Sequence, residues 1–196
     1  MRPGPAKSFD PDEALERARD LFWRHGYDGT GIRDLEEELG IGRKSLYDTF
    51  GSKRALFLRA IDQYADAVIG RICGRLGSAD GTPLQNVERA LDRLARHHGG
   101  SETLGCLLGV TMGQVDAADE ELVAAVRAPL RRLEDAFDGA LRAAREAGEI
   151  RADVRTRDVA RNLVALTQGM ALMGRLHDGA ARPRSAARAA LDLLRA

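Results

Sequence analysis

Hydrophobic positions recur at helical spacing along most of the chain. In its first part this spacing predicts three short helices, at about 11–25, 30–39 and 42–50, followed by a long fourth helix from Ser52 to about Leu76. The first begins at Asp10-Pro11, since Asp caps helix starts and Pro suits the first turn. Gly40 closes the second helix, only about three residues before the third begins. This spacing indicates a helix-turn-helix.

The remainder of the chain also shows only the helical period. After a Gly/Ser-rich linker at 77–83, helices are expected at 84–98, 103–114, 118–147, 156–177 and 185–195. Pro129 is expected to kink or divide the longest of them. No run alternates as a strand would. The predicted fold is all-α, with a flexible tail at 1–9, a helix-turn-helix domain at 10–60, and a helical effector-binding and dimerisation domain at 61–196, joined by the long helix.

The positive charge of the chain is concentrated around the third predicted helix. The 196 residues carry 30 cations and 30 acids, so overall charge alone does not indicate nucleic acid. Residues 41–60, however, contain five cations and a single acid, Asp48. Leu46 and Phe50 face inward on the third helix and hold its cations outward. A solvated basic face without a partner is the alternative.

Helix-turn-helix proteins read DNA with the first turns of such a helix. Arg43 and Lys44 can donate to guanine, Ser45 and Thr49 can reach a base or a phosphate, and Tyr47 and Lys53 suit the backbone. Asp48 either accepts from cytosine or pairs with Lys44 one turn earlier, and the pairing is favoured.

The stretch "GYDGTGIRDLEEELGIGRKSLYDTFGSKRALF" resembles the DNA-binding domain of the TetR/AcrR family of bacterial transcriptional regulators. The resemblance covers about residues 11–60. It implies that Thr30, Ser45, Tyr47 and Lys53 meet phosphates while Arg43 and Lys44 face bases. Gly31 and Gly42 replace the Ser or Thr common at these helix starts, which weakens the caps only slightly.

The resemblance also implies a homodimer formed through the last two long helices. Their apolar residues recur at steps of three and four, the spacing of helices that pack at shallow angles. Gly169 and Gly174 would allow close approach. Packing within one chain is the alternative. The predicted interface residues are Leu122, Val126, Leu133, Phe137, Leu163, Leu166, Met170 and Met173.

Polar residues interrupt two uncharged runs, at 103–115 and 162–174. A pocket with a few convergent polar groups is the usual small-molecule site. The family resemblance makes such an effector pocket expected, although each residue singly also suits a satisfied core position. The candidate effector-binding residues are Tyr64, Cys106, Gln114, Asn162 and Gln168. Cys106 is either a small buried side chain or a sensor of electrophiles and oxidants.

These features favour a one-component repressor that binds a palindromic operator in double-stranded DNA as a homodimer and is released by a small molecule. An activator and a non-specific architectural DNA binder are the alternatives, with an electrophile-sensing repressor acting through Cys106 as a third. No enzyme motif, metal spacing, cofactor motif or apolar signal segment is recognisable. A cytoplasmic, nucleoid-associated protein without membrane contact is therefore expected.

Overall fold

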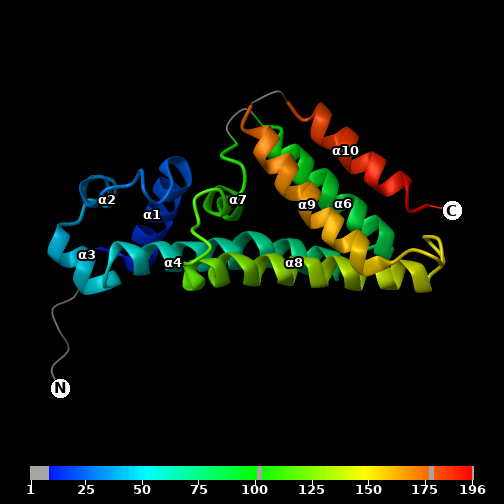
Figure 1. Cartoon of the computed structure of the whole chain (residues 1–196), viewed down its shortest axis with the longest axis horizontal. Helices are drawn as coiled ribbons and strands as arrows, with labels where there is room; N and C mark the ends of the chain where they lie inside the picture. Colours follow the sequence, from blue (N-terminus) through cyan, green and yellow to red (C-terminus); the bar gives the residue numbers. More distant parts are fainter. Residues whose placement is uncertain (1–8, 101–102, 177–178, 196) are drawn as a thin grey trace, which may run out of the picture. The chain divides into compact units, whose positions relative to one another are not determined.

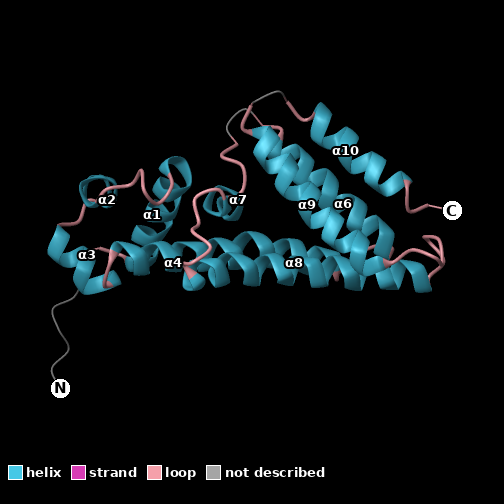
Figure 2. Cartoon of the chain, viewed as in Figure 1, coloured by secondary structure: helices cyan, strands magenta, loops and turns pink. Residues whose placement is uncertain are grey.

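The computed structural model describes residues 9–100, 103–176 and 179–195, and every regular element in these ranges is helical (Figures 1 and 2). This confirms the all-α fold. The described chain divides into two compact units, one ending at Tyr64 and the other beginning at Ala65. They are called here the N-terminal and C-terminal units. The predicted tail lies almost wholly outside the described residues.

The N-terminal unit contains α1 (Pro11–His25), α2 (Ile32–Leu39), α3 (Arg43–Phe50) and α4 (Lys53–Tyr64). Asp10 caps α1 by accepting from the amide of Asp12 at 2.9 Å, as its sequence predicts. The core of the unit is aromatic: the Phe22 ring meets Phe57 edge-on at 4.9 Å, and Tyr27 lies 5.0 Å from Phe57. These contacts join α1, the turn after it and α4 into one body.

The C-terminal unit begins with a π-helical turn, η1 (Ala65–Ile69), followed by α5 (Gly70–Leu76). The residues of the expected long helix are helical to Leu76, but they include a π-helical turn that the sequence did not indicate. α6 (Pro83–His98) packs against α5, α8, α9 and α10. Thr82 and Gln85 form a capping box at its start.

The last part of the chain forms α7 (Leu107–Met112), α8 (Glu120–Glu146), α9 (Thr156–Gly174) and α10 (Ala181–Asp192). α7 is shorter than predicted because Gly105, at φ +81°, lies outside helical geometry. Of the two outcomes expected at Pro129, a division of the helix is wrong, because α8 remains a single helix across it. None of the helices in the described ranges is long and apolar enough to cross a membrane.

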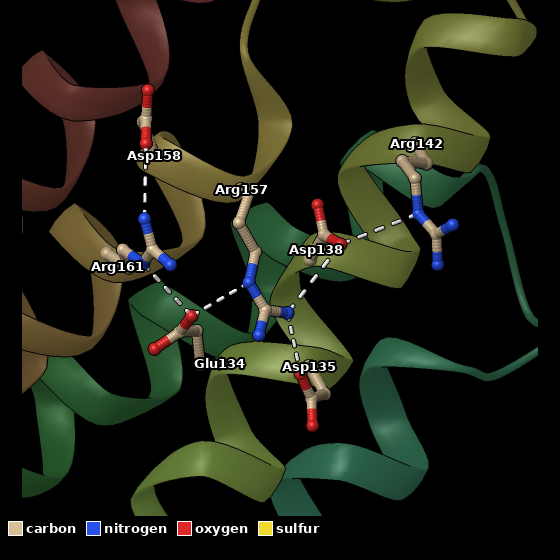
Figure 3. Close-up of polar contacts among 7 residues, drawn as sticks. All are labelled: Glu134, Asp135, Asp138, Arg142, Arg157, Asp158 and Arg161. Carbon is tan, nitrogen blue, oxygen red and sulfur yellow. Dashed lines mark hydrogen bonds and ion pairs between the residues drawn. The ribbon is translucent and has the colours of Figure 1, made fainter.

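Ion pairs join α8 to α9 (Figure 3). Arg157 on α9 reaches Glu134 at 2.9 Å and Asp135 at 2.6 Å, and its pKa is raised first by the hydrogen bond to Asp135. Arg161, one turn along, contacts the same Glu134 oxygen at 3.3 Å. Exposed ion pairs add little stability singly. The network links the charged edges of the two helices.

The predicted interface residues have a different role in the structure. Leu133, Phe137 and Leu163 are at most 1% exposed within a single chain. Leu122, Val126 and Met170 are also buried, so these six side chains belong to the core of the C-terminal unit and offer little surface to a second chain. Leu166 is half-buried and Met173 exposed. The alternative of packing within one chain holds for the six.

Candidate nucleic-acid interface and ligand cavity

The turn between α2 and α3 is built by glycine. Gly40 adopts φ +67°, ends α2 and lets the chain reverse within three residues. Gly31 is the N-cap residue of α2 and has no side chain that could cap the helix. The Asp34 carboxylate, three residues on, accepts a hydrogen bond from the Gly31 amide at 2.6 Å. Gly42 starts α3 with no side-chain cap. The first-turn amides of α3 are therefore not covered by a capping side chain.

The face that α3 turns outward carries the predicted readers of bases. Leu46 and Phe50 are buried, while Arg43, Lys44 and Ser45 are exposed in the first turn. This division follows from the helical period, because residues four apart lie on one face. The exposed face is cationic and polar, as a helix in the major groove requires.

Aromatic rings lie beside two of the cations predicted to bind DNA. The Arg43 guanidinium lies 5.8 Å from the centre of the Tyr47 ring, and the Lys53 ammonium 4.2 Å from that of Tyr27. Such contacts attract a cation to the ring face. Tyr47 and Thr49 are half-buried, as is Lys53 at the start of α4.

Lys44 binds Asp48 one turn along α3, with Nζ 2.7 Å from Oδ2. The favoured pairing is therefore confirmed. The hydrogen bond to Asp48 is the main cause of the raised pKa of Lys44. Both side chains are largely exposed, at 90% and 61%, so the pair can open to a competing acceptor.

Thr30 does not share this surface. Its side chain is buried, and its hydroxyl donates to the carbonyl of Gly26 at 2.7 Å. The hydroxyl thus closes the turn between α1 and α2. The hydroxyl could donate to a phosphate only if this buried hydrogen bond broke. The expectation that Thr30 contacts phosphate from the protein surface is therefore corrected.

In the C-terminal unit, three of the five predicted effector residues line one cavity of about 420 Å³ between α7 and α9. They are Cys106, Gln114 and Gln168. The side-chain oxygen of Gln168 is buried without a hydrogen-bond partner and lies against Gly109, where an added Cβ would come within 2.9 Å of it. A buried acceptor of this kind calls for a donor.

The other two candidates lie elsewhere. Tyr64 is buried in the N-terminal unit, with its ring 5.0 Å from that of Trp23. Asn162 is exposed on α9 and lines a separate groove near the end of α10. Arg175, the residue directly after α9, also lines the Cys106 cavity, although the sequence pattern did not indicate it. No local signal marks it, because its contribution depends on how α7 and α9 pack.

Cys106 is buried, and it is the N-cap residue directly before α7. Cys73 is half-buried, and its thiol donates to the carbonyl of Arg132 at 3.7 Å. Burial is the main cause of the raised pKa of Cys73. Neither cysteine forms a disulfide, and no group of histidines, cysteines and carboxylates in the described ranges could hold a metal ion.

Comparison with known proteins agrees with this geometry. Residues 14–60 match the model for "Bacterial regulatory proteins, tetR family", and residues 84–190 match that for "Tetracyclin repressor-like, C-terminal domain". The HTH-type transcriptional regulator YezE of Bacillus subtilis is 33% identical over 148 residues, which are 75% of this chain and 76% of that protein.

Two further relatives concern DNA directly. The HTH-type transcriptional repressor ComR of Escherichia coli is 44% identical over 63 residues, only 32% of this chain and 30% of its own length. A structure of the TetR family regulator CifR, a cysteine mutant complexed with 26-bp double-strand operator DNA, has a TM-score of 0.87 and 25% identity, covering 97% of this chain and all of that one.

Proposed function

The chain belongs to the TetR family of bacterial transcriptional regulators, and from this premise we propose that it is a repressor that binds a palindromic operator as a homodimer. A small molecule in the Cys106 cavity releases it. It acts by binding and not by catalysis, at the nucleoid. The observation that carries the proposal is the outward cationic face of α3, supported by the repressor ComR and by the operator complex of CifR.

The base contacts are assigned to Arg43 and Lys44, which are exposed in the first turn of α3. Ser45, Tyr47, Thr49 and Lys53 are assigned to the phosphates that flank them. Lys44 exchanges Asp48 for an acceptor on the DNA when the protein binds. This exchange is accessible because both partners are solvent-exposed.

The test begins with an operator selected from a random DNA pool by the full chain. Arg43→Ala and Lys44→Ala should each cost about 1–3 kcal/mol of operator affinity, with a smaller loss on unrelated duplex. Lys53→Ala should weaken all sequences alike and reduce the salt slope by about one. Fluorescence anisotropy at several salt concentrations measures both.

Arg17→Ala is the matched control. Arg17 is an exposed cation of the same unit, but it lines a surface with Asp34, Glu37 and Glu38 rather than the outer face of α3. It should leave operator affinity within about twofold. Equal losses on operator and unrelated DNA for Arg43→Ala and Lys44→Ala would favour a non-specific architectural binder.

The homodimer is assigned to the exposed face of α9. From Asn162 to Gly174 this helix carries no charged residue, yet Ala165, Gly169 and Leu172 on it are exposed. Leu172 is 68% exposed and Leu176, just beyond the helix, 63%. A contiguous apolar surface of this kind is typical of an interface. Two-fold pairing of the chain would account for a palindromic operator.

The effector is proposed to bind reversibly, through the unpartnered oxygen of Gln168 and the polar groups beside it. Electrophile sensing through Cys106 is the second candidate, favoured by the position of this thiol in the same cavity as Arg175. Benzoquinone distinguishes them. We expect Cys106→Ser to bind operator normally, and wild type and variant to lose operator equally little at low benzoquinone doses.

Release of wild type at a low dose, with the Cys106→Ser protein still bound and the adduct on Cys106 by mass spectrometry, would establish the electrophile sensor instead. Cys73→Ser is the control, because Cys73 does not line this cavity.

A further inference from the structure

A second hollow in the C-terminal unit is independent of the Cys106 cavity. It is a groove of about 440 Å³ between α5 and α6, a size within the usual range of small-molecule sites. Its floor is apolar and is made by Val68, Ile72, Ala90 and Leu94. Its walls are made by Arg71, Arg75, Arg93, Arg96 and His97.

The arginines reach the groove from two helices. Arg71 and Arg75 are one turn apart on α5, and Arg93 and Arg96 are three residues apart on α6, so each pair shares one face of its helix. All four are exposed. No carboxylate is among the residues that line the groove. Four positive charges therefore surround one small apolar floor.

Few of these charges are compensated within the chain. Arg96 pairs with Asp92 at 2.8 Å, and the Arg71 side chain donates to the carbonyl of Ala67. Arg75 and Arg93 have no ion pair among the residues that the structure describes. Like charges on neighbouring turns destabilise a helix unless something neutralises them.

A neighbouring groove shows the contrast. Between α6 and α10, the cations Arg184, Arg188 and Arg195 are accompanied by Glu88, Asp92 and Asp192. Arg195 pairs there with both Glu88 and Asp192. In that groove acids accompany the arginines, whereas no acid is among the described residues that line the groove between α5 and α6.

Guanidinium groups bind carboxylate and phosphate oxygens in pairs, with matched planar geometry. We propose that the groove between α5 and α6 binds a small amphipathic anion. Its carboxylate or phosphate lies between Arg75 and Arg93, and its apolar part lies along Ile72 and Leu94. The ligand site is distinct from the Cys106 cavity, and it does not depend on the proposed repressor function.

Arginine stems also cover apolar surface without any ligand. That reading predicts a loss of stability but no anion binding when the charges are removed. The two readings differ in what a titration with an anion measures, so a binding experiment separates them.

The experiment is calorimetric titration of the full chain with decanoate below its micelle-forming concentration, with decanol as the uncharged probe. Decanoate should bind at least tenfold more tightly than decanol, and more weakly as salt is raised. Arg75→Gln with Arg93→Gln should weaken decanoate at least tenfold. Decyl phosphate should bind with the same dependence on these two residues.

Arg127→Gln with Arg131→Gln is the matched control, since it removes two exposed cations one turn apart on α8. Gln168→Leu controls for the Cys106 cavity. Both should leave decanoate affinity within twofold. Equal weakening in the α8 control, or loss only in Gln168→Leu, would overturn the proposed site.

Two other outcomes also overturn it: no decanoate binding to wild type, and binding only to vesicles of phosphatidylglycerol and phosphatidylcholine. The second would assign the groove to a lipid surface. Operator affinity is measured on the same samples. An intact operator complex without decanoate binding would reject this groove alone and leave the repressor proposal standing.

Discussion

His98 is the last residue of α6, and its ring is held in the interior of the C-terminal unit. It is 4% exposed, and its Nδ1 is buried without a hydrogen-bond partner. Burial, and secondarily the neighbouring His97, lowers the pKa of His98 from 6.5 to about 4. Protonation therefore favours the unfolded chain. The contribution of His98 to the free energy of unfolding is at its full value above pH 6.5. It falls as the pH drops from 6.5 to about 4, by up to about 1.4 kcal/mol per pH unit.

Replacing His98 by Leu should remove this dependence. Urea denaturation between pH 4.5 and 7 should show a shallower fall of the free energy of unfolding for His98→Leu than for wild type. His97→Gln is the comparison and should keep most of the slope, because burial of His98, and not the neighbouring His97, is the main cause of the lowered pKa. An identical slope for wild type and His98→Leu would mean that other groups titrate in this range.

At the scale of elements, the close approach of α9 to α6 depends on Gly174. A Cβ at this position would overlap the carbonyl oxygen of His98 and lie 2.9 Å from its carbonyl carbon. Because these are backbone atoms at the end of a helix, moving them away would disturb the helix and cost free energy. Gly174→Ala should destabilise the protein by about 1–3 kcal/mol, as overpacking does. A Cβ added at Gly139 on α8 would meet no other atom within 4 Å. Gly139→Ala should therefore stabilise the protein by up to about 1 kcal/mol, because Ala favours a helix more than Gly does.

At the scale of the whole molecule, the prediction concerns assembly. Ala165→Glu places a charge in the middle of the uncharged face of α9, where the single chain leaves it exposed. We expect a folded monomer by light scattering and circular dichroism, with operator affinity lost although the N-terminal unit is untouched. Ala128→Glu, exposed on α8, should remain dimeric. A dimeric Ala165→Glu protein would move the interface away from α9.

The all-α class and the outward face of α3 follow from the sequence alone. Residues four apart in one helix share a face, so the inward position of Leu46 and Phe50 determines that Arg43 and Lys44 point outward. The pair of Lys44 and Asp48 is equally local, because its partners are one turn apart. Short-range geometry of this kind does not depend on the rest of the fold.

Only the tertiary structure decided which faces of α8 and α9 are internal. A helix that is apolar on more than one side does not indicate which side its own chain covers, and the predicted interface therefore included core residues such as Phe137. The Cys106 cavity with Arg175, and the meeting of Arg75 with Arg93 across a groove, were equally hidden. Their members lie far apart in the sequence and converge only when helices pack.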